Sequence, residues 1–184
     1  MLLGSRAGLL TPVNDGVAFD LGGLLHSAVA GFASLSGRHD LVLVAALLLP
    51  LAVGDPSSFE IIVGQLLENA VKYSPAGGEV RVTSASDGDR VVMTVADRGS
   101  GISYYERALI FDRFHQVSDA LTGKPPGTGL GLTICRMMLR QLGGEIWAGA
   151  APGGGALLTV RLQRSAVAVT DAPRQPQPAA ASGS

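Results

Sequence analysis

The chain has 184 residues, of which 47% are apolar and 16% are charged, and its formal net charge is -1. This length supports one domain with a hydrophobic core rather than two. The nearly neutral charge provides no positive field that would attract nucleic acid or an anionic membrane, so we expect neither as a partner.

Two features bear on the compartment in which the chain works. The most apolar stretch, residues 41–53, is interrupted by Pro50 and is shorter than the roughly 20 residues that a membrane-spanning helix needs. Residues 1–10 lack a sustained apolar run followed by a small-residue cleavage site, which argues against a signal peptide. We therefore expect a cytoplasmic chain, in which the single cysteine, Cys135, is an inert core thiol.

The two ends differ in composition from the middle of the chain. Residues 1–16 combine several glycines, one proline and an Asn-Asp-Gly turn without helical periodicity, which indicates an N-terminal linker. Residues 165–184 are rich in Pro, Ala, Gln and Ser, a composition typical of a disordered tail. We predict that residues 17–164 form the folded domain.

The first half of this domain contains two predicted helices. Residues 17–20 predict a short strand, and residues 21–35 an amphipathic helix. Asp55 is the expected N-cap of a second helix that begins at Pro56 and ends near Ser74. Between the two helices, the sequence favours strands at 40–46 and 51–53.

The second half consists mainly of predicted strands. The turn Asp87-Gly88-Asp89 predicts an antiparallel hairpin, and the irregular residues 112–126 suggest a mobile lid or binding loop. The expected strands cover residues 79–86, 90–96, 145–150 and 156–163, and a helix covers residues 130–142. Helices and mostly antiparallel strands in separate runs predict a two-layer α/β (α+β) sandwich.

Gln65–Ser74, on the second predicted helix, is the first of four segments that carry candidate site residues. Asn69, Lys72 and Tyr73 lie within about one helical turn, so an amide, an ammonium group and an aromatic ring can face one pocket. This set suits a metal-bound phosphate and a base.

The other three segments follow in chain order. Asp97–Ile102 places a carboxylate at the end of a strand, where two glycines allow close approach of a ligand, and a carboxylate is a good acceptor for an amino group. Phe111–Phe114 comes next, and both of its phenylalanines would ordinarily be expected in the core. Gly127–Leu132 leads into a helix, where free amides bind phosphate readily.

In this order and spacing, the four segments resemble the N box, first glycine box, F box and second glycine box of bacterial sensor histidine kinases. These kinases belong to the GHKL superfamily, which includes gyrase, MutL and heat-shock chaperones. The resemblance implies the Bergerat fold, a mixed five-stranded sheet packed on three helices, and it implies ATP and Mg²⁺ as cofactors.

The resemblance also implies roles for individual residues. Asn69 and Lys72 would be catalytic, with Asn69 on Mg²⁺ and Lys72 on phosphate, while Gln65 would occupy the position of a second amide ligand to the metal. Tyr73 would lie against the adenine, and Asp97 would accept a hydrogen bond from the adenine amino group. The remaining expected nucleotide contacts are Gly99, Gly101, Ile102, Phe114 in the lid anchor, and the triphosphate loop residues Gly127, Thr128, Gly129, Leu130, Gly131 and Leu132.

Gln65 departs from the family pattern. Histidine kinases usually carry Asn at this position, whereas the ATP-hydrolysing relatives and the anti-sigma-factor type of serine kinase carry Glu. Gln cannot act as a general base, and Glu68 sits at a different helical angle, so both alternatives lose their key residue. A degenerate interaction module stays open as a further alternative. The extra methylene of Gln65 is expected to disturb the metal contact and weaken ATP binding.

The implied function is to bind Mg-ATP and to donate the γ-phosphate to a histidine on a separate dimerisation domain, from which it passes to a response regulator in two-component signal transduction. The chain has three histidines. His39 precedes an acidic residue but lies beside a predicted strand, not on an exposed acceptor helix. His26 and His115 are interpreted as structural or solvated. We therefore expect the acceptor histidine to lie outside this chain.

Overall fold

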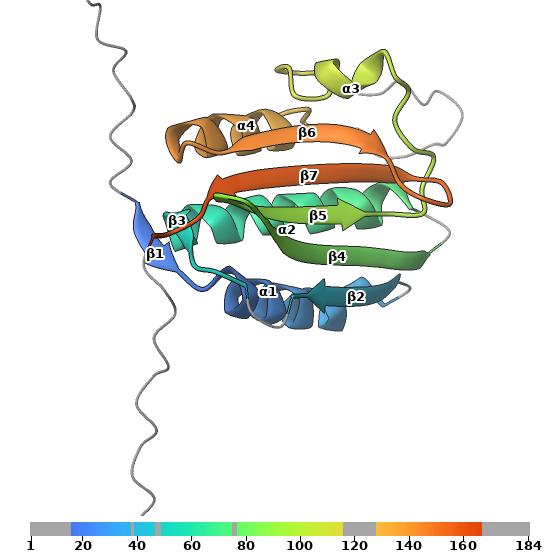
Figure 1. The fold of residues 1–184 in the computed structure, drawn as a ribbon. Coiled ribbons are helices and arrows are strands. Elements are labelled where there is room, and N and C mark those ends of the chain that lie inside the picture. The colour runs from blue at the N-terminus through green and yellow to red at the C-terminus, as the bar shows by residue number, and fades with distance from the viewer. Residues whose placement is uncertain (1–15, 38, 47–48, 75–76, 116–127, 167–184) are drawn as a thin grey trace, which may run out of the picture.

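The computed structural model describes residues 16–37, 39–46, 49–74, 77–115 and 128–166, which form a sheet with helices on one face (Figure 1). In spatial order, the five strands are β2 (His39–Ala45), β4 (Gly78–Asp87), β5 (Arg90–Ala96), β7 (Ala156–Gln163) and β6 (Glu145–Ala150). β2 runs parallel to β4 and the other neighbours are antiparallel, so the sheet is mixed. The covering helices are α1 (Leu21–Ser36), α2 (Pro56–Tyr73) and α4 (Gly131–Gln141). The predicted two-layer sandwich is confirmed.

Two small elements differ from the prediction. The strand expected at 51–53 is β3 (Ala52–Gly54), and it pairs with β1 (Val17–Phe19) in a separate two-stranded sheet. The short helix α3 (Glu106–Leu109) was not predicted, because four residues are too few to show helical periodicity.

Helix α2 is the central element of the core and begins as its sequence predicts. The Asp55 carboxylate accepts a hydrogen bond from the backbone N–H of Ser58 at 2.9 Å, and Pro56 occupies the first helical position. The buried face of the helix recurs at helical spacing and consists of Phe59, Ile62, Val63, Leu66, Leu67 and Ala70. Because each large apolar side chain contributes about 1.5–3 kcal/mol on burial, this face holds α2 firmly against the sheet.

The C-terminal end of the fold lies slightly beyond its predicted boundary. Ser165, which we assigned to the disordered tail, is buried, and its backbone N–H donates to the carbonyl of Leu51 at 2.7 Å. The preceding Arg164 forms a bridge with Ala52 of β3. These contacts tie the end of β7 to the small sheet, so the ordered region includes Ser165. Residues 1–15 and 167–184 lie outside the described residues.

Cys135 lies on the buried face of α4, as predicted. Burial in this apolar environment raises the pKa of its thiol from 9.0 to about 12. At pH 8, below both values, a difference of this size lowers the reactive thiolate population about 1,000-fold. We expect iodoacetamide to modify the native chain far more slowly than the chain in urea, as followed by mass spectrometry. Equal rates in the two states would contradict this assignment.

No helix within the described ranges combines the length and the apolar character that crossing a bilayer requires.

Candidate functional site

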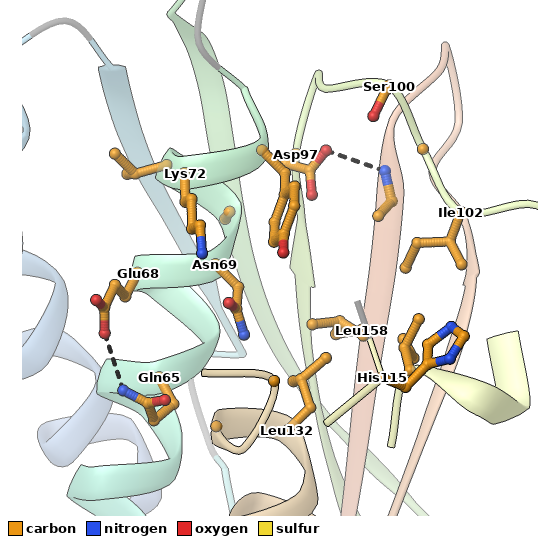
Figure 2. A pocket seen from close by; sticks show the side chains of 18 of the residues that line it. Gln65, Glu68, Asn69, Lys72, Asp97, Ser100, Ile102, His115, Leu132 and Leu158 are labelled. Atoms are coloured by element: carbon orange, nitrogen blue, oxygen red, sulfur yellow. Dashed lines mark hydrogen bonds between the residues drawn. The ribbon is translucent and has the colours of Figure 1, made fainter. Parts of the chain in front are cut away.

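A cavity of about 690 Å³ lies between the C-terminal half of α2, the end of β5 and the start of α4 (Figure 2). Its size falls in the range of sites that hold small molecules and cofactors. Segments far apart in the sequence meet here, and most of the predicted site residues line the wall: Gln65, Asn69, Lys72, Tyr73, Asp97, Gly101, Ile102, Thr128, Gly129, Gly131 and Leu132.

Asp97 is a buried carboxylate at the end of β5. Its Oδ1 accepts two backbone hydrogen bonds, from Gly99 at 2.8 Å and from Ala156 at 3.0 Å. The dashed line at Asp97 in Figure 2 marks the bond from Ala156. The Asp97 backbone N–H also donates to the carbonyl of Ala156 at 3.0 Å. Within the described part of the chain, no donor is bonded to Oδ2. The carboxylate is therefore fixed through one oxygen, and the other is available to a ligand in the cavity.

Gly99 does not line the cavity but allows its walls to come together. A Cβ atom built on Gly99 would lie 2.1 Å from the carbonyl oxygen of Tyr73, at the end of α2. Real Cβ atoms essentially never approach that closely, so only glycine permits this contact between the segment after β5 and the end of α2. The first glycine segment thus brings Asp97 and Tyr73 into the wall of one cavity.

Three side chains of α2 face this space as the helical spacing predicts. Asn69 has a buried Nδ2 atom with no hydrogen-bond partner among the described residues. Such a donor is costly to bury unless a ligand supplies an acceptor. The Lys72 ammonium lies 5.4 Å from the centre of the Tyr73 ring, so the cation and the aromatic face adjoin at the cavity wall.

Glu68 is a further residue of the cavity wall. The sequence indicated only that its helical angle differs from that of Gln65, and the structure shows that its side chain lines the cavity. Its Oε2 accepts a hydrogen bond from Nε2 of Gln65 at 2.9 Å (Figure 2). A long side chain at the rim of a helix face can reach further than its angle alone indicates, so Glu68 reaches the cavity beside Gln65.

The second glycine segment packs against the end of the F box. Gly129 has a φ of 66°, and a Cβ built on it would lie 2.9 Å from the Phe114 carbonyl carbon. The Phe114 N–H donates to the Gly129 carbonyl at 3.2 Å. Glycine at this position therefore permits both the backbone conformation and the close contact. Leu130 lies outside the cavity wall, and Gly127 lies outside the described residues.

The two F-box phenylalanines have opposite environments. Phe111 is buried, as expected for a core residue, whereas the side chain of Phe114 is 72% exposed. Phe114 also has a φ of 62°, an uncommon conformation for a bulky residue. The expectation of core packing is therefore wrong for Phe114, and the structure does not bring this side chain into the cavity wall.

The cavity also contains residues that the sequence did not indicate. His115, which we interpreted as structural or solvated, is partly buried in the wall, and its Nε2 atom is buried without a partner among the described residues. Its position directly after the F box was the available signal. Other lining residues, including Ala156 and Leu158 on β7, follow the inward-facing alternation of that strand.

The other two histidines lie outside the cavity wall. His39 begins β2, and its Nε2–H donates to the carbonyl of Ser74 at 2.7 Å, so the ring joins an edge strand to the end of α2. His26 is exposed on α1. The strand predicted at 40–46 is confirmed as β2, and His39 is its first residue.

The fold is a two-layer sandwich with a cavity between α2, β5 and α4. The chain belongs to the family described as histidine kinase-, DNA gyrase B-, and HSP90-like ATPase, whose model matches residues 54–166. This match includes all four segments singled out in the sequence.

Within this family, the chain is similar in sequence and in structure to sensor histidine kinases. The chain is 36% identical over 110 residues to the sensor histidine kinase WalK of Bacillus subtilis. The aligned region covers 59% of this chain and 18% of WalK. It superposes with a TM-score of 0.70 on full-length ShkA in complex with AMPPNP, at 29% identity over 84% of this chain and 32% of ShkA. The ATP-binding domain of PrrB from Mycobacterium tuberculosis gives a TM-score of 0.67 at 28% identity, covering 82% of this chain and 98% of that one. The chain thus spans less than a fifth of WalK.

Proposed function

We propose that this chain binds Mg-ATP and donates the γ-phosphate to a histidine on a separate dimerisation domain, as the ATP-binding catalytic part of a sensor histidine kinase. The observation that carries the proposal is Asp97, a buried carboxylate held through Oδ1 by two backbone N–H groups at the cavity wall. With Oδ1 held in this way, Oδ2 accepts a hydrogen bond from an amino group such as that of adenine.

The residues around Asn69 fit a metal-bound triphosphate. The unpartnered Nδ2 of Asn69 marks a polar group that a phosphate oxygen or a metal-bound water would satisfy. Amide oxygens are suitable Mg²⁺ ligands, so Asn69 and Gln65 would hold the ion, which would neutralise phosphate charge. Lys72 supplies a cation on the same side of the cavity, and Gly129 and Gly131 allow close approach of the backbone.

In this proposal the chain works by positioning and charge neutralisation. Asp97 and Tyr73 orient the base, and Ile102, Leu132 and Leu158 exclude water from it. Lys72 stabilises the phosphates while the acceptor histidine of the partner domain attacks the γ-phosphorus. The bond from this phosphorus to the β,γ-bridging oxygen breaks, and ADP leaves. A response regulator then receives the phosphate from that histidine. We expect these partners, the cytoplasmic location, and a domain of residues 17–164 between a linker and a tail, extended by Ser165.

A calorimetric titration with ATP, with and without Mg²⁺, tests the proposal. We expect Mg²⁺ to strengthen binding, and the Asn69→Leu variant to lose about tenfold or more of this enhancement. The described residues provide no partner for Asn69 Nδ2, so leucine, which is similar in size, breaks no hydrogen bond of that nitrogen. Ile61→Leu, an exchange on the exposed face of the same helix, is the matched control.

A chain that binds no ATP under either condition would overturn the proposal and leave the degenerate interaction module as the better account. Steady release of phosphate by the isolated chain would instead favour the hydrolase relatives. A second assay adds an isolated dimerisation domain from a sensor histidine kinase, and acid-labile phosphate on its histidine is the expected product.

A further inference from the structure

The Gln65 amide has a defined neighbour on each side. Its Nε2 donates to Oε2 of Glu68 at 2.9 Å, while its Oε1 lies against Gly131 at the start of α4 (Figure 2). A Cβ atom built on Gly131 would lie 2.2 Å from this oxygen. The nitrogen therefore faces along α2, and the oxygen faces the second glycine segment.

We propose that Glu68 is a positioning residue that orients the Gln65 amide, so that its oxygen and not its nitrogen faces the Mg²⁺ of bound Mg-ATP. This inference rests on the proposed function. An ionised carboxylate only accepts hydrogen bonds, so it selects the NH₂ end of the amide. Only the oxygen end of an amide is a suitable ligand for Mg²⁺. The two ends have nearly the same size, so shape alone distinguishes them poorly.

The spacing on α2 supports this role. Glu68 follows Gln65 by three residues, so the two side chains are neighbours on the helix surface. Asn69 follows Gln65 by four residues, and all three side chains line the same cavity. The orienting carboxylate and both amides therefore share one wall, next to the segment that would hold the triphosphate.

An ordinary helix-surface ion pair is the simpler account of Glu68, and the contacts argue against it. Lys72 lies one turn further along α2, at the spacing of a stabilising Glu–Lys pair. Within the described ranges no ion pair joins them; the Lys72 ammonium lies instead over the Tyr73 ring. Glu68 is thus hydrogen-bonded to Gln65, and the Lys72 ammonium is available to bind the phosphates.

A double-mutant cycle in the full chain tests the inference. We titrate ATP into the wild type, Glu68→Ala, Gln65→Leu and the double variant, each with EDTA and with Mg²⁺. A parallel titration with Mn²⁺ and ATP, followed by electron paramagnetic resonance, reads metal binding directly. Because residues that orient a ligand typically affect metal affinity 10–100-fold, we expect Glu68→Ala to lower the Mg²⁺ enhancement about tenfold. ATP binding in EDTA should not weaken.

The cycle separates an effect through Gln65 from an effect of the carboxylate itself. We expect Glu68→Ala to have no further effect once Gln65→Leu has removed the amide, since coupled residues are not additive. Glu60→Ala, an exposed glutamate of α2 outside the cavity wall, is the matched control and should match the wild type.

Two results would overturn this inference and leave the proposed function standing, and a third would overturn both. If the wild type binds Mg-ATP and Glu68→Ala keeps the full Mg²⁺ enhancement, Glu68 does not position Gln65. If Glu68→Ala causes the same loss with and without the Gln65 amide, the carboxylate acts by its own charge. If the wild type binds no nucleotide, the proposed function fails, and this inference fails with it.

Discussion

The Asp97→Asn variant is expected to lose ATP affinity by about 100-fold, since a charged hydrogen bond is lost and two donors are left facing each other. Asparagine keeps an Oδ1 that can accept from Gly99 and Ala156, so the local backbone contacts can persist. The substitution replaces Oδ2 by an NH₂ group, which then meets the amino group of adenine. Calorimetry with ATP measures the loss.

The same variant should gain affinity for inosine triphosphate, whose base carries an oxygen in place of that amino group and so accepts from the new NH₂. A change of base preference cannot arise from general unfolding, which would weaken both nucleotides alike. Asp87→Asn, at an exposed position at the end of β4, is the control and should bind ATP like the wild type. Unchanged ATP binding in Asp97→Asn, or equal loss of both nucleotides, would contradict the assigned role.

Gly99→Ala is expected to damage both stability and binding. The new Cβ would lie 2.1 Å from the Tyr73 carbonyl oxygen and 2.8 Å from its carbon, and neither backbone atom can yield without moving the end of α2. We expect the free energy of unfolding to fall by about 1–3 kcal/mol, as for other overpacked sites. Displacement of Asp97 relative to Tyr73 should also weaken ATP binding by about 100-fold, the loss seen for misplacements near 1 Å.

Urea unfolding and ATP titration of the still-folded variant measure these two effects. Gly64→Ala provides the opposite control, because a Cβ on Gly64 meets nothing within 4 Å and the residue lies inside α2. Alanine there should raise the free energy of unfolding by about 0.5–1 kcal/mol and leave ATP binding unchanged. A Gly99→Ala variant as stable as the wild type would show that the end of α2 is free to move.

Features of the fold that depend on near neighbours in the sequence were predictable. The cap at Asp55 depends on Ser58, three residues away, and the β4–β5 hairpin depends on the turn at Gly88. The helices and strands therefore lie close to their predicted ranges, apart from the short α3. The strands β1 and β3 were both predicted, but their pairing with each other was not, because strand pairing depends on contacts distant in the sequence.

The site residues that lie together on one segment were predictable. The environment of a residue at a contact between two segments was harder to predict. Asn69, Lys72 and Tyr73 line the cavity as their spacing on α2 predicts. Phe114 was expected in the core, yet its positive φ and its contact with Gly129 leave the ring exposed. The hydrophobicity of a side chain does not reveal such a backbone turn.

The sequence by itself determined the sandwich class, the family resemblance and the residues of the N box and glycine boxes, because these follow from local spacing and chemistry. Only the tertiary structure decided how Asp97 is held, since its partner Ala156 lies 59 residues away, and which way the Gln65 amide points. Both depend on backbone approaches between separate segments. Periodicity records which face of an element is buried, but it does not record what that face meets.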